Sequence, residues 1–440
     1  MERLPPTILV IFGITGDLSH RFLLPALAEI VTAGQISVDF KILGVSRQSV
    51  NVEDVFKEAQ EPLKNHAEIL QMDYDSKAAY ESLKSKLEEV AAQDSQIIFY
   101  FALPPDAVPA VVKNLGESGL NTPNTKLLLE KPFGVDLESA RKLIEETAKY
   151  YPEDQVYRID HYLAKEMAQN ITVFLGSNSI FRGVWSNAFI DEIEVLAAEK
   201  IGIEGRGHFY EGTGALRDFI QSHLLQLAAL VLMEPCSDIF DFAEIPQRRL
   251  AALKAIKPIP ADEINRRAFR AQYEGYKEEV KNPESTVETF ASLTLESSDP
   301  RWEGVPIRLI TGKNLDQKLT QIKVRFKKVA DAQTNSLMIK IAPKEGIELD
   351  LWVKEPGYER KLQKLPLSFA YEQHFGRLPD AYEQVLIDAM RGNHSLFASS
   401  TEVLASWEII DPVLKYWQTN KDVPLYKPGS TIEEVLSIKK

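Results

Sequence analysis

Up to residue 159, short apolar runs alternate with stretches of helical periodicity, and this alternation constrains the fold more than any other feature of the sequence. The first apolar run, at 7–12, is followed by a helical pattern at 18–31, and short turns separate the later elements in the same way. Such alternation is typical of parallel strands joined by crossover helices. We therefore expect an α/β domain of the Rossmann type. Its further strands are expected at 40–45, 97–103, 126–130 and 155–159, and its further helices at 78–91, 107–116 and 137–149.

Past residue 185 the pattern changes, because strand-like segments follow one another without intervening helices. Consecutive strands joined by short polar turns predict a mostly antiparallel sheet. Two helices, at 214–233 and 382–390, are expected to cover one face of this sheet. We therefore expect two domains, at 1–157 and 158–440, of which the second is a larger α+β domain. The strand-like segments lie at 190–199, 285–295, 305–311, 320–327, 336–341 and 347–353.

Composition narrows the classes of function. The single cysteine, Cys236, forms no intramolecular disulfide and offers no metal cluster. No segment approaches the roughly 18 apolar residues of a membrane span, and the N-terminus does not have the pattern of a signal peptide. We therefore expect a cytoplasmic protein without a membrane partner. The formal net charge of −13 argues against nucleic acid as a partner, and an anionic substrate would need a local basic site.

A glycine pair lies between the first strand and the first helix. Gly13 and Gly16 open the run Gly13-Ile14-Thr15-Gly16-Asp17-Leu18. A glycine turn in this context lets the backbone approach the pyrophosphate of a dinucleotide, and the helix N-terminus adds N–H donors. A tight strand-to-helix turn without a ligand also favours glycine, so both interpretations stay open.

The end of the second strand bears on the choice of dinucleotide. A carboxylate there would accept from the ribose 2′-hydroxyl of NAD, whereas an arginine would pair with the 2′-phosphate of NADP. This chain has Ser46 and Arg47 at that place and no carboxylate beside them. The guanidinium of Arg47 suits a phosphate because its donors form a planar fork. An exposed surface arginine is the alternative.

The run at 158–166 concentrates cations, an imidazole, a phenol and carboxylates in nine positions. If a helix begins near Asp160, then His161, Tyr162 and Lys165 share one face and form a phosphate clamp at a helix N-terminus. Asp160 would then point to another side. The alternative is a solvated helix start with surface ion pairs, in which His161 is a partly buried structural histidine.

His223 falls within the apolar face of the helix expected at 214–233. A buried imidazole needs a partner, so His223 is either a structural histidine bonded to a carbonyl or a general base oriented by a carboxylate. Asp218 lies five residues earlier, about 140° round an ideal helix. Asp218 and His223 can face one site only if the helix begins later or is irregular.

These motifs resemble those of the glucose-6-phosphate dehydrogenase family, in the same order over nearly the whole chain. The run at 160–166 is similar to the family signature Asp-His-Tyr-Leu-Gly-Lys-Glu, with Ala164 in place of the glycine. Two segments, at 47–96 and 260–301, are shorter than we expect for the family, and Ala271 stands where glycine is usual. The matching runs are GITGDL at 13–18, ALPP at 102–105, EKPFG at 130–134, DHYLAKE at 160–166, EGRG at 204–207, RDFIQSHLLQ at 217–226, RWEGVP at 301–306, TGK at 311–313 and WEIIDP at 407–412.

The resemblance implies oxidation of D-glucose 6-phosphate to 6-phospho-D-glucono-1,5-lactone, the first step of the pentose phosphate pathway. It implies NADP as the cofactor, with NAD as a possible second cofactor, no metal, and a homodimer or homotetramer formed through the large sheet. His223 would be the base and Asp160 the carboxylate behind it, and the Lys131–Pro132 bond would be cis. Alternatives are another NAD(P)-dependent sugar or sugar-phosphate dehydrogenase, and a non-catalytic NADP-binding regulator, which would be expected to lose His223 or Asp160.

The resemblance also assigns binding roles. The substrate would contact Lys131, His161, Tyr162, Lys165, Glu199, Asp218 and Lys313, and the cofactor would contact Gly13, Thr15, Gly16, Asp17, Leu18, Ser46, Arg47 and Lys131. For Lys313, a solvated lysine at a strand end is the alternative.

Overall fold

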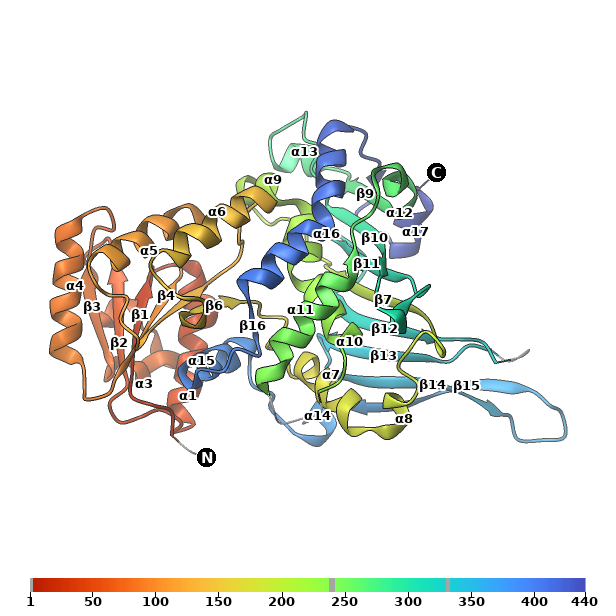
Figure 1. Ribbon diagram of the computed structural model, residues 1–440, viewed down its shortest axis with the longest axis horizontal. Coiled ribbons are helices and arrows are strands. Elements are labelled where there is room, and N and C mark those ends of the chain that lie inside the picture. Colours follow the sequence, from red (N-terminus) through yellow and green to blue (C-terminus); the bar gives the residue numbers. More distant parts are fainter. Residues whose placement is uncertain (1–2, 237–241, 330–332, 440) are drawn as a thin grey trace. The chain divides into compact units, whose positions relative to one another are not determined.

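The computed structural model describes residues 3–236, 242–329 and 333–439 (Figure 1). The chain forms two compact units, and each is described by itself. Unit 1 consists of residues 1–134, 138–164 and 379–400, and unit 2 consists of residues 135–137, 165–378 and 401–440.

The parallel sheet expected in the first domain is confirmed in unit 1. Its strand order is β16-β6-β5-β4-β1-β2-β3, and all neighbouring pairs are parallel except β16 with β6. The order 3-2-1-4-5-6 of the parallel strands is that of a doubly wound dinucleotide-binding sheet. The strands are β1 (Thr7–Phe12), β2 (Lys41–Ser46), β3 (Ala67–Gln71), β4 (Gln96–Phe101), β5 (Thr125–Leu129), β6 (Val156–Ile159) and β16 (Phe397–Ala398).

Both faces of this sheet are buried, which explains the nearly continuous apolar sequence of its central strand. Along β1, Leu9 and Ile11 belong to one apolar core, and Ile8 and Val10 belong to the other. The second core also contains apolar side chains of α4 and α5. The helices from 24 to 148 are α1 (Leu24–Thr32), α2 (Val52–Val55), α3 (Glu61–Lys64), α4 (Lys77–Val90), α5 (Val108–Glu117) and α6 (Leu137–Ala148).

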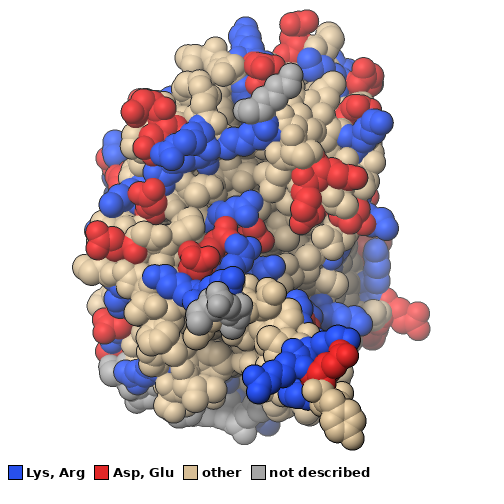
Figure 2. Space-filling model, turned by 90° about the vertical axis from the view of Figure 1, so that its right-hand side faces the viewer, with Lys and Arg blue, Asp and Glu red and all other residues tan. Residues whose placement is uncertain are grey.

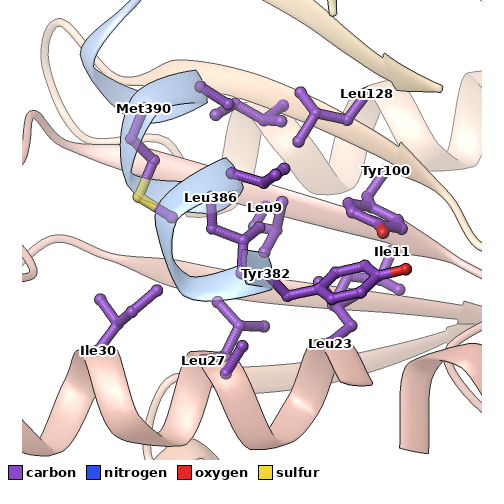
Figure 3. Packing of buried hydrophobic residues seen from close by; sticks show 14 of the residues in the cluster. Leu9, Ile11, Leu23, Leu27, Ile30, Tyr100, Leu128, Tyr382, Leu386 and Met390 are labelled. Atoms are coloured by element: carbon purple, nitrogen blue, oxygen red, sulfur yellow. The ribbon is translucent and has the colours of Figure 1, made fainter. Parts of the chain in front are cut away.

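Helix α15 (Ala381–Arg391) belongs to unit 1, so the expectation that the segment 382–390 covers the antiparallel sheet is wrong. Its apolar side completes the first core of the parallel sheet. Figure 3 shows side chains of α15 facing those that rise from α1 and the π-helical segment before it. The Lys126 ammonium donates to the Ala389 carbonyl at 2.7 Å, which fixes the end of α15. The compact units therefore differ from the division expected at residue 157.

The mostly antiparallel sheet is confirmed in unit 2. Its strand order is β15-β14-β13-β12-β7-β11-β10-β9-β17, with β8 paired to β10. Only two of these pairs are parallel, β7 with β11 and β9 with β17. The strands are β7 (Ile190–Ala198), β8 (Ile256–Lys257), β9 (Ala268–Tyr273), β10 (Phe290–Ser297), β11 (Ile307–Gly312), β12 (Leu319–Phe326), β13 (Ser336–Ala342), β14 (Gly346–Lys354), β15 (Leu362–Ala370) and β17 (Leu425–Tyr426).

The segment expected as one helix at 214–233 is divided. A kink at Gly214 lies within the last residues of α9 (Gly207–Ala215). A π-helix, η5 (Leu216–Leu224), follows, and an ordinary helix, α10 (Leu225–Leu232), completes the segment. The helix η5 packs on β11, β7 and β10. The helices of this unit are α7 (Glu166–Ser177), α8 (Ser179–Arg182), α9 (Gly207–Ala215), α10, α11 (Ile245–Ala255), α12 (Ile264–Arg267), α13 (Tyr276–Glu279), α14 (Tyr371–His374), α16 (Ser400–Thr419) and α17 (Ile432–Ser437).

The surface mixes charges of both signs, although the chain is acidic as a whole. In unit 2, Arg308 lies 3.2 Å from Glu194 on the neighbouring strand, and Arg325 lies 2.7 Å from Glu192. Figure 2 shows basic and acidic side chains interspersed over one side of the molecule. Across the described part of the chain, no helix is both long and apolar enough to span a membrane.

A buried carboxyl in α15 predicts a pH-dependent stability. Asp388 is 4% exposed, and burial raises its pKa from 3.8 to about 6, although a hydrogen bond from Gln384 acts in the opposite direction. Between these two values the folded state binds more protons than the unfolded state, so this group lowers stability as the pH rises, by up to about 3 kcal/mol. The Asp388→Asn variant removes this dependence. Its melting temperature relative to wild type should therefore increase between pH 4.5 and pH 7.5.

Thermal melting of both proteins at the two pH values measures this difference. The Glu88→Gln variant, altered at an exposed position of α4, is the control and should show no such change. A melting difference for Asp388→Asn that stays constant with pH would contradict the prediction.

Candidate functional site

The glycine turn after β1 has the geometry that close approach of a ligand requires. Gly13 has a φ of +79°, and a Cβ there would lie 2.3 Å from the Ala102 carbonyl oxygen, so only glycine fits. The Gly16 N–H donates to the Gly13 carbonyl at 2.9 Å, and the Ser19 hydroxyl donates to the same carbonyl at 3.0 Å. Thr15 and Asp17 are exposed at the turn, and Leu18 is half-buried. The turn thus presents backbone and small side chains to solvent, followed directly by helical residues.

Ser46 and Arg47 lie at the same edge of the sheet as this turn, because the Gly13 N–H donates to the Val45 carbonyl at 3.1 Å. Ser46 is buried, and its hydroxyl accepts from the Gln48 N–H at 3.1 Å. The Arg47 side chain is exposed, with its guanidinium carbon 5.7 Å from the centre of the Tyr74 ring. An exposed guanidinium beside a glycine turn suits the 2′-phosphate that distinguishes NADP from NAD.

Lys131 follows β5 at the carboxyl edge of the same sheet, and its bond to Pro132 is cis, as the family resemblance implies. The preceding residue, Glu130, accepts from the Tyr100 hydroxyl at 2.5 Å and also from Tyr382. Burial raises the pKa of Glu130, whereas these two hydrogen bonds and the charge of Lys131 lower it. The hydroxyls of Tyr100 and Tyr382 point to the same side in Figure 3. Sequence analysis did not single out Glu130, because Tyr382 reaches it from the distant C-terminal part of the chain.

The helix expected to begin near Asp160 does not form there. The Asp160 carboxylate accepts from the Tyr162 N–H at 2.9 Å, and its carbonyl accepts from the Leu163 N–H at 3.0 Å, which makes a turn. Aspartate side chains compete for backbone N–H groups in this way and so disfavour helix interiors. Asp160 is buried, and His161 and Tyr162 are half-buried, with their rings 5.0 Å apart. The expectation that His161, Tyr162 and Lys165 share one face of a helix that begins near Asp160 is therefore wrong.

Lys165 is the residue before α7, which begins at Glu166. The helix start is held by Glu345, whose carboxylate accepts from the Met167 N–H at 2.6 Å. Burial raises the pKa of Glu345, and the charge of Lys165 lowers it, so the two side chains are electrostatically coupled. Ala164 is buried and is not among the described residues that have a positive φ, so this position does not require the family glycine.

The irregularity expected between Asp218 and His223 is present. Both residues lie in η5, where hydrogen bonds join residues five apart, as in the bond from the Leu225 N–H to the Ile220 carbonyl. A π-helix takes more residues per turn than an α-helix, so Asp218 and His223 lie nearer to one side here than the roughly 140° of an ideal α-helix would place them. His223 is 1% exposed, and its ring lies edge-on to Phe219 at 5.5 Å.

Lys313 joins Glu199 and Asp218 into a charged cluster. Its ammonium forms an ion pair with Glu199 and lies 3.8 Å from the Asp218 carboxylate. The ring centres of Tyr210 and Phe219 lie 5.1 and 5.7 Å from the same nitrogen. Lys313 is 3% exposed, so the alternative of a solvated lysine is wrong.

The parallel pair β7–β11 explains how the cluster forms. Ala198 and Gly312 are partners in the register of these strands, so Glu199 and Lys313 leave the sheet side by side. The helix η5 packs on both strands and adds Asp218. Two carboxylates with one compensating ammonium are suited to accept hydrogen bonds from the hydroxyls of a polyol. Within residues 3–236, 242–329 and 333–439, no three His, Cys, Asp or Glu side chains form a potential metal site.

The matching family models and the similar curated proteins agree on one family. The family model described as "Glucose-6-phosphate dehydrogenase, NAD binding domain" matches residues 10–170, and "Glucose-6-phosphate dehydrogenase, C-terminal domain" matches residues 172–435. A glucose-6-phosphate 1-dehydrogenase of Chlamydia muridarum is 36% identical over 478 residues, covering 97% of this chain and 93% of the relative. One of Rhizobium meliloti is 35% identical, covering 96% of this chain and 93% of the relative.

A solved structure of a protein from the same family has a similar fold. The structure described as "Glucose-6-phosphate dehydrogenase in complex with its substrate glucose-6-phosphate" superposes with a TM-score of 0.91 at 30% sequence identity. The alignment covers 100% of this chain and 98% of that one, so the similarity includes both units.

Proposed function

Because this chain belongs to the glucose-6-phosphate dehydrogenase family, we propose that it oxidises D-glucose 6-phosphate to 6-phospho-D-glucono-1,5-lactone with NADP as the cofactor. This is the first step of the pentose phosphate pathway. The observation that carries the proposal is the arrangement around η5, which contains both the buried His223 and Asp218, with the Asp218 carboxylate 3.8 Å from the Lys313 ammonium. One short helix thus carries both the candidate base and Asp218, the member of the charged cluster that does not follow a strand.

The residues at the glycine turn fit a dinucleotide. The backbone at Gly13 and Gly16, with Thr15, Asp17 and Leu18, would hold the pyrophosphate, since the turn leaves no room for a Cβ at Gly13. Ser46 and Arg47 would hold the 2′-phosphate, and the absence of a neighbouring carboxylate favours NADP, so NAD would serve at most as a secondary cofactor. When bound, NADP supplies the acceptor for the hydride that leaves C1 of the sugar.

The sugar phosphate would be held by two groups of side chains. Glu199 and Asp218 would accept hydrogen bonds from its hydroxyls, with Lys313 compensating their charge and Lys131 beside the reacting carbon. His161, Tyr162 and Lys165 would bind the 6-phosphate, since an imidazole, a phenol and an ammonium all donate hydrogen bonds to phosphate oxygens.

His223 would act as the general base that takes the proton of the 1-hydroxyl as the hydride leaves. An imidazole suits this role because it is the side chain whose unperturbed pKa lies nearest neutral pH. Asp160 would orient the imidazole and stabilise its protonated form. These roles rest on the match of both residues to the family motifs, and the proton and hydride transfers need no metal.

Two other functions would leave different signatures. Another sugar dehydrogenase of this two-domain plan would not need the phosphate-binding side chains, so it would turn over sugars that have no phosphate. A non-catalytic NADP-binding regulator would show no turnover, but such a protein would be expected to lose His223 or Asp160, and this chain retains both.

The decisive experiment measures absorbance of the reduced nicotinamide with a matrix of sugars, sugar phosphates, NAD and NADP. We expect the highest kcat/KM with glucose 6-phosphate and NADP, and only weak turnover of glucose. Equal turnover of glucose and glucose 6-phosphate would favour the broader class of sugar dehydrogenases, and no turnover with any pair would favour the regulator.

Replacing Arg47 tests the choice of cofactor. The Arg47→Ala variant should weaken NADP binding by about 2–3 kcal/mol, the scale of a lost charge-assisted hydrogen-bonding partner, and should leave NAD nearly unchanged. Titration of both dinucleotides, with Arg141→Ala on the exposed side of α6 as control, measures the effect. Equal losses for NAD and NADP would place Arg47 outside the 2′-phosphate site.

Replacing His223 and Asp160 tests the mechanism. The His223→Asn variant should retain folding and binding but lose roughly 10²–10⁴-fold in kcat, as expected for a lost general base. The Asp160→Asn variant should also lower kcat, and the two losses should be non-additive because the residues act as one unit. Wild-type turnover should fall on acidification as the base takes up a proton.

Steady-state kinetics of the two single variants and the double variant check this prediction. Near-normal turnover by correctly folded His223→Asn would refute the assignment of the base, and Lys131 would become the first alternative. Fully additive losses would mean that Asp160 does not act through His223.

The proposal includes a cytoplasmic homodimer or homotetramer. Exposed apolar side chains along β14 and β15, among them Leu351, Leu365 and Leu367, support association through the large sheet. Light scattering of the purified protein at micromolar concentration measures the mass, and a monomer at every concentration would refute this part.

A further inference from the structure

The start of η5 is held by hydrogen bonds to Glu288, which is distant in the sequence. Gly214 has φ 68° and ψ 170°, so the chain turns sharply there and leaves the first N–H groups of η5 without partners in the preceding helix. Glu288, 72 residues from Leu216, meets the N–H of Leu216, the first residue of η5, and that of Ala215 directly before it. Its carbonyl accepts from the Ala215 N–H at 2.9 Å, and its carboxylate accepts from the Leu216 N–H at 3.0 Å.

The fit at this point is tight. Glu288 is 6% exposed, and a Cβ at Gly214 would lie 2.5 Å from its carboxylate oxygen. Burial raises the pKa of Glu288, whereas the hydrogen bond from Leu216 and the charges of Arg217 and Arg270 lower it. Burying a carboxylate costs free energy unless it is hydrogen-bonded. If Glu288 served packing alone, an apolar residue could take its place without this cost.

The next residue extends the same contact to Lys313. The Thr289 carbonyl accepts from the Lys313 N–H at 2.9 Å, and the Tyr426 hydroxyl donates to the Lys313 carbonyl at 2.5 Å. The Thr289 and Tyr426 hydroxyls are themselves hydrogen-bonded at 3.0 Å. Two consecutive residues directly before β10 thus contact both the start of η5 and the lysine of the cluster, so a displacement of this dipeptide would disturb Asp218, His223 and Lys313 together.

We propose that Glu288 is a positioning residue for the reaction: its carboxylate fixes the N-terminus of η5 and thereby aims Asp218 and His223 at the sugar. This inference rests on the function proposed above. Glu288 itself touches no reacting atom. Its effect should therefore appear in the sugar phosphate kinetics and not in NADP binding, because the residues proposed to hold NADP belong to unit 1.

The test compares Glu288→Ala with the conservative Glu288→Gln, which keeps an oxygen that can accept from Leu216. Glu288→Ala should lower kcat/KM for glucose 6-phosphate by roughly tenfold to a hundredfold, the scale of a misplacement of about 1 Å, with the KM for NADP unchanged. Glu288→Gln should recover most of this loss. In the His223→Asn background, Glu288→Ala should cost much less than it does in wild type, because both act on the same step.

The control is Glu434→Ala, which removes a carboxylate that accepts from the Thr431 N–H at 2.8 Å at the start of α17, a helix without proposed site residues. It should leave kcat/KM unchanged. The inference is overturned if Glu288→Ala retains the wild-type kcat/KM, if the KM for NADP rises in parallel, or if the double-variant losses are additive. It is also overturned if Glu288→Ala fails to fold while Glu288→Gln has wild-type kinetics, since the residue would then serve folding alone.

Wild-type protein measured in the same series separates the two claims. No wild-type turnover of glucose 6-phosphate would refute the proposed function and this inference with it. Wild-type turnover together with an unaffected Glu288→Ala variant would refute only the role of Glu288.

Discussion

The ion pair between Lys313 and Glu199 depends on one parallel strand pair within a mostly antiparallel sheet, and the rest of the cluster depends on that ion pair. Because β7 and β11 run in the same direction, their carboxyl ends meet at one edge, where Glu199 and Lys313 follow directly. An antiparallel pair would have placed these residues at opposite edges. The helix η5 then crosses both strands and brings Asp218 to the same ammonium.

Burying such charges has a cost that only complete pairing offsets. Removing an ammonium and two carboxylates from water is unfavourable unless each finds partners, and here Lys313 also lies against the faces of Tyr210 and Phe219. Because these groups already hold one another, little reorganisation would be needed if the sugar bound to the two carboxylates as proposed. Preorganised polar groups of this kind stabilise a transition state better than mobile ones.

In unit 1, the parallel sheet forms the apolar core and also carries the loop that contains Lys131. Its strands are buried on both faces, and α15 returns from the C-terminal part of the chain to cover one of them. Through Tyr382 this helix also hydrogen-bonds Glu130, the residue before Lys131. The late segment of the chain therefore supports the loop proposed to lie between substrate and cofactor, which ties the packing of the core to the position of Lys131.

The parallel sheet, the glycine turn and the antiparallel sheet could be predicted from the sequence, because strand and helix periodicities and glycine requirements are local properties. The order of the family motifs could likewise be read directly from the residues. The turn at Asp160, the π-helix that contains Asp218 and His223, and the place of α15 became known from the three-dimensional structure alone. At Asp160 a competing side-chain hydrogen bond replaces the expected helix start, whereas α15 forms as its periodicity predicts and differs only in the sheet against which it packs. Glu288 meets the start of η5 from 72 residues away, and no pattern within 214–233 could have revealed it.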